Sequence, residues 1–296
     1  MSTISDQVRT IQIVSGNAIT PNPHVVYQNN SLIYTLPVGL NLDNGIEVCL
    51  QSMYISYSWF NLSTALNNVT FSYIFNGVTY NLTIPAGFYA YSDGYNDLYN
   101  WFVDSCVQNG TYLLDNNGNP QVFINWVENP VYYGLTFTFT PIPTVLPTGW
   151  TNPAAIALSG NSPQLIINNN NLQYYLGLAA GTYPTVPATI VTYVNSNNPN
   201  GYPPAESNVQ SVNVTCNMVN NSLIQGNTSL IANFPPNTQF GGQISYLPTQ
   251  FLWQPTSGGV YSNIIFKFLD QGNNQLYLQD STGITINILL RRKPKT

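Results

Sequence analysis

Alternating apolar and polar residues run along most of the chain, and this period of two predicts strands rather than helices. Between residues 44 and 61 the apolar residues occupy even positions up to Leu50 and odd positions from Met53 onward. A change of parity within one strand requires an extra residue. We therefore expect one long strand with a β-bulge near Gln51–Ser52.

A β-hairpin is predicted over residues 71–84. Two alternating runs, 71–75 and 78–84, are joined by Asn76-Gly77. Both central residues of a type I′ turn need a positive φ angle, which Asn and Gly adopt most readily. Further alternating runs predict strands over 122–126, 134–140, 212–218 and 264–268. A last hairpin is expected to cross the turn DQGNNQ (270–275) and to continue through 276–278 and 284–290.

Helical periodicity is confined to two places. Apolar or small residues recur with helical spacing at Leu98, Trp101, Phe102, Ser105 and Cys106. Ser92 is a suitable N-cap for this helix, and Asp93 and Asp97 are acidic residues in its first turns, where the helix dipole favours negative charge. Asn109-Gly110 is expected to end the helix. A second short helix is expected over 170–178, ended by Gly181.

About eight to eleven strands and one main helix favour a β-sandwich with long connections. We predict an all-β chain: a single jelly-roll β-sandwich with elaborated loops and one or two short helices. The expected divisions are an N-terminal arm with the first strand region (1–30), the jelly-roll domain (31–290) and a basic C-terminal tail (291–296). Long loops or an insertion are expected within 141–208, which is rich in Pro, Gly and Asn.

Composition narrows the class of protein. Only 6% of the 296 residues are charged, whereas soluble proteins average about 25%. Asn is abundant, with 41 residues, and 44% of the chain is hydrophobic. A helical bundle would contain more Ala, Glu and Lys, and a disordered chain would contain fewer apolar residues.

The six cations are unevenly placed. Arg9 and Lys267 are isolated, and the other four are Arg291, Arg292, Lys293 and Lys295, near the C-terminus. An acidic body repels phosphate groups, so we expect no binding along a nucleic acid duplex. The tail allows a weak, salt-sensitive contact with a genome or an acidic neighbour. The alternative interpretation is a solvated end of the last strand.

No catalytic or metal-binding motif is found in the sequence. His24 is the only histidine. The sequence contains no nucleophile motif such as GxSxG, no nucleotide-binding motif and no Cys/His cluster. Asp115 begins a polar turn that lacks the last ligand of a calcium loop. We therefore expect no enzymatic activity and no cofactor. No apolar run approaches the length of a membrane-spanning helix, so no membrane insertion is expected.

Cysteine and tryptophan residues give two further expectations. Cys49, Cys106 and Cys216 are far apart and odd in number, which favours buried free thiols and a reducing compartment. Trp59, Trp101 and Trp126 fall on apolar faces and are expected in the core. Trp150 and Trp253 lie in Pro-rich loops, and are the better candidates for contact with a partner.

The order and spacing of several segments resemble the penton (minor capsid) proteins of virophages and of Polinton-type and adintovirus-like elements. The first segment is IEVCLQSMYISYSWFNL, and FSYIFNGVTYNLTIPAGFYAYSDGYNDLYNWF follows it. The second segment contains the family's IPxGxY step at Ile84, Pro85, Gly87 and Tyr89. Further matches are LQYYLGL, with Leu178 where Phe is common, then SVNVTCNMV and IIFKFLD…LYLQD…ITINILL.

This resemblance implies a jelly roll that forms homopentamers at the vertices of a small icosahedral virus of the double-jelly-roll type. It implies contact with a neighbouring major capsid protein, assembly in the host cytoplasm and a final location in the virion. Two alternatives stay open. One is a carbohydrate- or receptor-binding β-sandwich, and the other is a jelly-roll glycoside hydrolase, which would need two carboxylates in one cleft.

Overall fold

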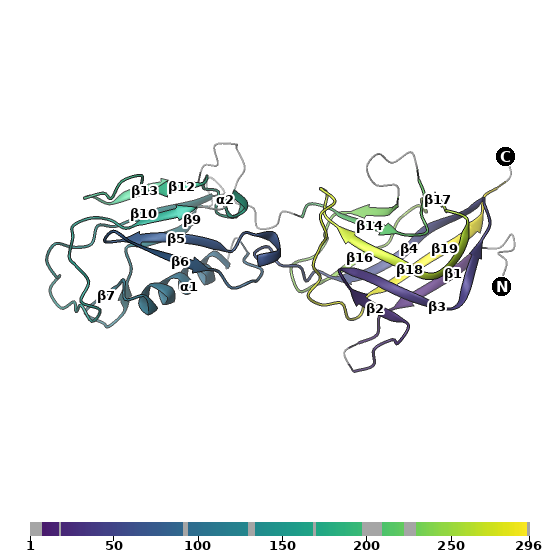
Figure 1. The fold of residues 1–296 in the computed structure, drawn as a ribbon, viewed down its shortest axis with the longest axis horizontal. Helices are drawn as coiled ribbons and strands as arrows, with labels where there is room; N and C mark the ends of the chain where they lie inside the picture. The colour runs from purple at the N-terminus through teal and green to yellow at the C-terminus, as the bar shows by residue number, and fades with distance from the viewer. Residues whose placement is uncertain are drawn as a thin grey trace. The chain divides into compact units, whose positions relative to one another are not determined.

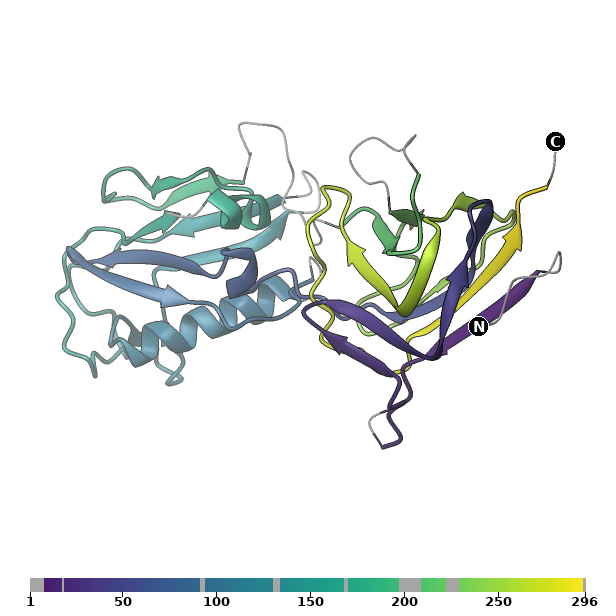
Figure 2. The same ribbon diagram turned by 45° about the vertical axis from the view of Figure 1, so that its right-hand side comes forward.

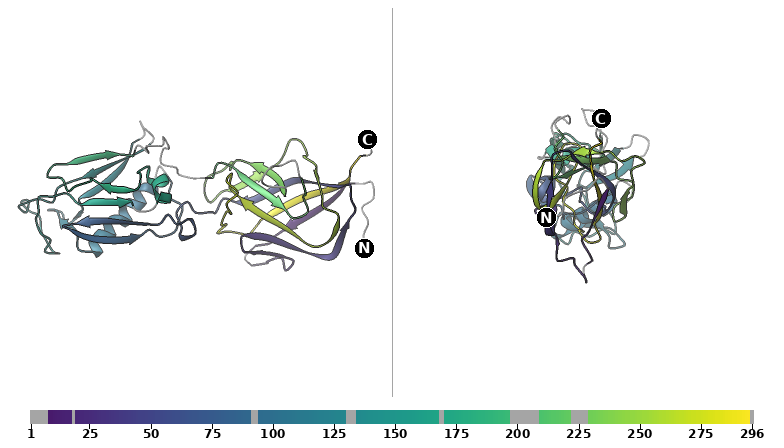
Figure 3. Two further views of the ribbon diagram at one scale, coloured as in Figure 1. Left: turned by 45° about the horizontal axis from the view of Figure 1, so that its top comes forward. Right: turned by 90° about the vertical axis from the view of Figure 1, so that its right-hand side faces the viewer.

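The computed structural model describes residues 8–17, 19–90, 94–129, 134–167, 170–196, 209–221 and 229–294 (Figure 1). The chain divides into two compact units. Unit 1 combines Met1–Trp59 with Val209–Thr296, and unit 2 is Phe60–Asn208. Unit 2 is therefore an insertion into a connection of unit 1, and both ends of the chain belong to unit 1 (Figure 3).

Unit 1 contains two antiparallel sheets. The first has the order β1 (Arg9–Val14), β19 (Thr285–Arg292), β4 (Ile46–Ser56) and β16 (Gln243–Tyr246), with the short β17 (Gln254–Pro255) also paired to β4. The second has the order β15 (Leu230–Phe234), β14 (Val212–Cys216), β18 (Gly259–Leu269), β3 (Ser31–Leu42) and β2 (Val25–Gln28). The strands of both sheets are visible in Figure 2.

The strand order of unit 1 is that of a jelly roll. Eight strands follow one another along the chain as β1, β3, β4, β14, β15, β16, β18 and β19. If these eight strands are numbered 1 to 8 in that order, the first sheet has the order 1-8-3-6 and the second the order 5-4-7-2. Successive strands thus cross between the sheets, except for the neighbouring pair β14 and β15, and this is the double Greek key of a jelly roll. The predicted fold class is confirmed, and unit 2 lies between the third and fourth strands.

The bulge predicted in the long strand is confirmed. In the pairing of β4 with β19, Ser52 lies opposite Asn287, but Leu50 lies opposite Ile288. Gln51 is the extra residue. The bulge lets apolar residues on both sides of it face the core, and Leu50 and Met53 are both buried.

The predicted last hairpin is found only at its turn, where Leu269 and Gln275 form an isolated antiparallel bridge. Its extension into the last strand is wrong. β18 belongs to the second sheet and β19 to the first, so the connection 270–284 passes between sheets. Leu276 and Leu278 are buried, as their alternation indicates, but neither lies in a strand. Alternation reports burial on one face, and it does not report which strand is the neighbour.

Unit 2 has its own sheets and helices. One sheet has the order β12 (Gly181–Tyr183), β11 (Gln164–Ile167), β5 (Thr70–Phe75) and β6 (Val78–Thr83). A second has the order β13 (Thr192–Asn195), β10 (Gly134–Phe139) and β9 (Ile124–Asn129). The remaining elements are the pair β7 (Leu113–Leu114) and β8 (Pro120–Gln121), α1 (Gly94–Gln108), α2 (Asn170–Leu176) and the 3-10 helix η1 (Thr64–Leu66).

Local predictions within unit 2 are confirmed. β5 and β6 form the expected hairpin, with φ angles of 48° at Asn76 and 81° at Gly77. α1 buries Leu98, Phe102 and Cys106 against the core of this unit and ends before Gly110, whose φ is 67°. The proposed N-cap residues Ser92 and Asp93 lie outside the described residues. The second helix differs from its prediction, because α2 ends at Leu176, before Gly177 with its φ of 68°, and does not continue toward Gly181.

The domain boundaries differ from those expected. The interpretation of 31–290 as one domain with an insertion inside 141–208 placed residues 60–140 in the jelly roll. In the structure β5 pairs with β11 through Ser72 opposite Ile166. This pairing joins both halves of 60–208 into one unit with a common core. The tail boundary also differs, because β19 continues through Arg292.

Candidate partner-contact site

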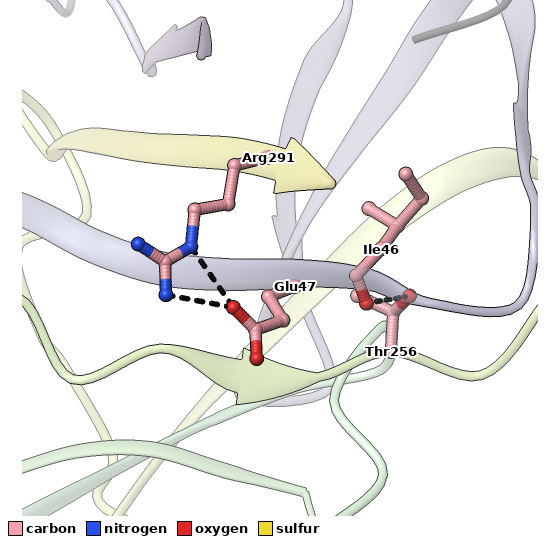
Figure 4. A network of polar contacts seen from close by, with 4 residues as sticks. All are labelled: Ile46, Glu47, Thr256 and Arg291. Carbon is pink, nitrogen blue, oxygen red and sulfur yellow. Dashed lines mark hydrogen bonds and ion pairs between the residues drawn. The ribbon is translucent and has the colours of Figure 1, made fainter. Parts of the chain in front are cut away.

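The end of β19 carries an ion pair across the first sheet of unit 1. Arg291 lies directly opposite Glu47 of β4. Nε and Nη2 of Arg291 each lie 2.9 Å from Oε2 of Glu47 (Figure 4). The side chains are 30% and 14% exposed, so the pair is more shielded from water than a typical surface pair.

The ring of Trp253 lies against the guanidinium group of Arg291. The guanidinium carbon of Arg291 lies 4.0 Å from the centroid of the Trp253 ring. β17 follows directly and places Pro255 opposite Glu47. The Thr256 hydroxyl donates a hydrogen bond of 2.9 Å to the Ile46 carbonyl oxygen, which holds the end of β17 against β4 (Figure 4).

The next two cations are more exposed. Arg292 Nη2 lies 3.3 Å from Asp43 Oδ2, and these side chains are 43% and 54% exposed. The Lys293 amide donates to the Gly45 carbonyl oxygen at 2.7 Å, and its side chain is exposed. Lys295 lies outside the described residues. Two of the four cations expected to contact a partner are therefore held against acidic residues of the same chain.

An exposed apolar segment ends at Trp253 in the chain, directly before β17. We define the apolar segment as residues 247–253, between β16 and β17. Leu247, Phe251 and Leu252 are 62%, 45% and 61% exposed. The Phe251 ring meets the Trp253 ring edge-on at 6.5 Å. Since neighbouring exposed apolar residues mark contact surfaces, this segment and Arg291 form one candidate partner-contact site.

The other tryptophans are not part of this site. Trp150 belongs to unit 2, where it is half-buried and packs against the core of that unit. The structure therefore does not bring the two predicted contact tryptophans together within one unit. Trp59 and Trp126 are buried, and Trp101 is half-buried against the unit 2 core, as expected.

All three cysteines are buried free thiols, as predicted. Burial raises the pKa of Cys49 to about 11, and the nearby charge of Arg291 opposes this rise. Burial likewise raises the pKa of Cys106 to about 11 and that of Cys216 to about 12. Thiols with such pKa values are poor nucleophiles near neutral pH.

The isolated acids serve as turn residues. Asp115 accepts hydrogen bonds from the amides of Asn117 and Asn119. Asp270 accepts two backbone hydrogen bonds in the turn after β18. Among the described residues, no group of three His, Cys, Asp or Glu side chains could hold a metal ion. No helix in the described part of the chain is long and apolar enough to cross a membrane.

Sequence reasoning missed the acidic partners of the site, Glu47 and Asp43. Both lie more than two hundred residues from their arginines, so no local pattern connects them. The apolar segment carried a usable signal. Three large apolar residues in succession, Phe251, Leu252 and Trp253, lie in a polar, Pro-containing stretch that does not alternate.

No protein-family model and no curated protein sequence matches this chain. Two solved structures are similar to it along nearly its whole length. The crystal structure of the selenomethionine-labelled mavirus penton protein has a TM-score of 0.42 and 10% identity, covering 96% of this chain and 98% of that one. The cryo-EM structure of the Sputnik virophage has a TM-score of 0.36 and 11% identity, covering 97% and 98%. Both TM-scores lie below 0.5, so the fold assignment rests on this chain's own strand order.

Proposed function

We propose that this chain is a structural capsid protein that forms homopentameric vertices of a small icosahedral virus. The observation that carries the proposal is the jelly-roll strand order of unit 1, a fold that recurs in viral capsid proteins. The sequence resemblance to penton proteins supports it, because its segments lie in the same order along nearly the whole chain. On this proposal the chain works as a shell component of the virion and has no catalytic role.

A closed ring of five copies needs two different complementary surfaces on each copy. Low charge favours such contacts, because burying an unpaired charge is costly. The apolar segment, with Leu247, Phe251 and Leu252 exposed, supplies apolar area for one of these surfaces. Arg291 is already paired with Glu47, so burying this site in an interface would leave no new charge unpaired.

The remaining partners follow from the same proposal. The neighbouring major capsid protein is the expected second partner. Lys293 is exposed at the end of β19 and is the described tail cation best placed for contact with an acidic neighbour or, weakly, with the genome. Contacts of this kind would weaken as salt concentration rises.

Electron microscopy of the purified chain tests the proposal. We expect class averages with fivefold rotational symmetry for the wild-type protein. Leu252→Asp should prevent ring formation, because it places a charge in the apolar segment. Val38→Asp is the matched control, since Val38 is also an exposed apolar residue of unit 1 but lies on β3. A wild-type chain that remains a single copy under all conditions would contradict the proposal and favour a monomeric binding module.

A further inference from the structure

The outer face of the second sheet of unit 1 carries an open pocket of about 470 Å³. Its walls come from β14, from β18 and from the turn that follows β18. Its lining includes Thr215, Asn217, Ile265, Lys267, Leu269 and Asn273. This volume falls within the roughly 300–1,000 Å³ usual for small-ligand sites.

Among the described residues that line this pocket, Lys267 is the only charged one. It lies on β18 directly opposite Thr215 of β14, with an exposed side chain. It forms no ion pair with any described residue. The nearest acid in sequence, Asp270, is engaged in its own turn, where Oδ1 accepts from the amides of Gly272 and Asn274 and Oδ2 accepts from the Asn274 side chain.

The residues around Lys267 include both an amide that hydrogen bonds hold in place and apolar side chains. Both polar atoms of the Asn217 side chain are hydrogen-bonded. Oδ1 accepts from the Ile265 amide at 2.9 Å, and Nδ2 donates to the Asn263 carbonyl oxygen at 3.1 Å. Ile265 is half-buried and Leu269 is buried, so Ile265 supplies most of the apolar surface beside Lys267. Asn273 is exposed at one edge, and its side-chain oxygen accepts from the Asn213 side chain at 3.5 Å.

We propose that this pocket binds an acidic sugar, with the carboxylate on Lys267 and the ring over Ile265. Among the described lining residues Lys267 supplies one positive charge, which neutralises one carboxylate but would leave a doubly charged phosphate partly uncompensated. Amide and hydroxyl groups of Asn273 and Thr215 suit the hydroxyl groups of a sugar. The inference goes beyond the capsid role, since it requires neither a pentamer nor any other partner.

A titration of the full chain followed by NMR tests this inference. The probes are N-acetylneuraminic acid and glucuronic acid, with N-acetylglucosamine as the neutral sugar and acetate as the free carboxylate. Because the pocket is open and has one charge, we expect dissociation constants on the order of 1 mM for the acidic sugars. Lys267→Gln should weaken their binding by about tenfold or more.

Lys293→Gln is the matched control, because it removes one exposed positive charge from the same unit and leaves the pocket intact. It should bind the acidic sugars like the wild type, and thermal unfolding should show that both variants fold. Three results would overturn the inference: equal binding of the neutral sugar, equal binding of acetate, or equal losses in the two variants. Absence of binding at about 10 mM acidic sugar would overturn it as well.

Discussion

The guanidinium group of Arg291 lies over the indole ring of Trp253, with 4.0 Å between Cζ and the ring centroid. Both residues were expected to be available to a partner, and in the structure each covers the other. Arg291 also contacts Glu47, so one side chain joins β19, β4 and the end of the apolar segment. A partner that binds here therefore meets a surface whose charges are already neutralised and whose geometry is already held.

Removing the cation from this arrangement should destabilise unit 1. Arg291→Gln leaves the mostly buried Glu47 carboxylate without its partner, and we expect a loss of about 1–3 kcal/mol in the free energy of unfolding. Arg292→Gln is the control, because the exposed pair with Asp43 should contribute no more than about 0.5 kcal/mol. Urea unfolding of both variants measures the difference, and equal losses would show that the Arg291 pair has no special role.

The contact between Arg291 and Trp253 should appear as an energetic coupling. A double-mutant cycle with Arg291→Gln and Trp253→Leu should give a coupling free energy of about 0.5–2 kcal/mol, as expected for a cation–π pair shielded from water. Purely additive effects of the two substitutions would mean that the two groups do not stabilise each other.

Acid should weaken unit 1 through Asp280. This carboxylate accepts hydrogen bonds from Thr282 and from the hydroxyl of Ser56, which lower its pKa below the ordinary value of 3.8. A lowered pKa contributes stability that is complete above the unfolded-state value and is lost as pH falls through the folded-state pKa. Asp280→Asn should therefore show a flatter loss of unfolding free energy below about pH 4 than the wild type.

The pKa of Asp280 can also be measured directly by NMR. Thr282→Val removes the hydroxyl donor that contributes most to lowering this pKa, and should move the pKa back toward 3.8. An unchanged pKa in this variant would assign the effect to other donors.

The three thiols should be protected in the folded protein. Burial raises the pKa of each of them, so little thiolate is present at pH 8. A thiol-reactive dye should label the native chain very slowly at this pH and should label all three cysteines in denaturant. Rapid labelling of the native protein would mean that at least one of these sites opens to solvent.

The turn of the hairpin in unit 2 offers a test of backbone conformation alone. Gly77 has a φ angle of 81°, and no atom lies within 4 Å of the position that a Cβ would occupy. Gly77→Ala should therefore cost about 1–2 kcal/mol through strain rather than collision. Gly39→Ala is the control, since Gly39 has no positive φ and a Cβ there would make ordinary contacts. Equal stability of the two variants in thermal unfolding would contradict the expected turn.

Features set by neighbouring residues were predictable from the sequence. The parity change at Gln51–Ser52 located a bulge, and Asn76-Gly77 located a hairpin, because each depends on a few consecutive residues. The helical stripe from Leu98 to Cys106 was likewise sufficient for α1.

Features set by distant pairing were not predictable. The division at Phe60 depends on the pairing of β5 with β11, about ninety residues further along the chain. The last hairpin fails beyond its turn for the same reason, since alternation in 264–268 and 284–290 could not show that β18 and β19 join different sheets. The candidate site contains residues that were predictable from the sequence and residues that were not. Trp253 and Arg291 were identified locally, whereas Glu47 became visible only with the pairing of β4 and β19.

The most direct test of the proposed capsid role is the mass of the assembled wild-type protein under native conditions, measured by mass spectrometry. The chain has a mass of 32.7 kDa. A closed homopentamer predicts a dominant species of five times this mass that loses subunits when Leu252→Asp disrupts the apolar segment. A dominant species of one, two or three chain masses would contradict the account.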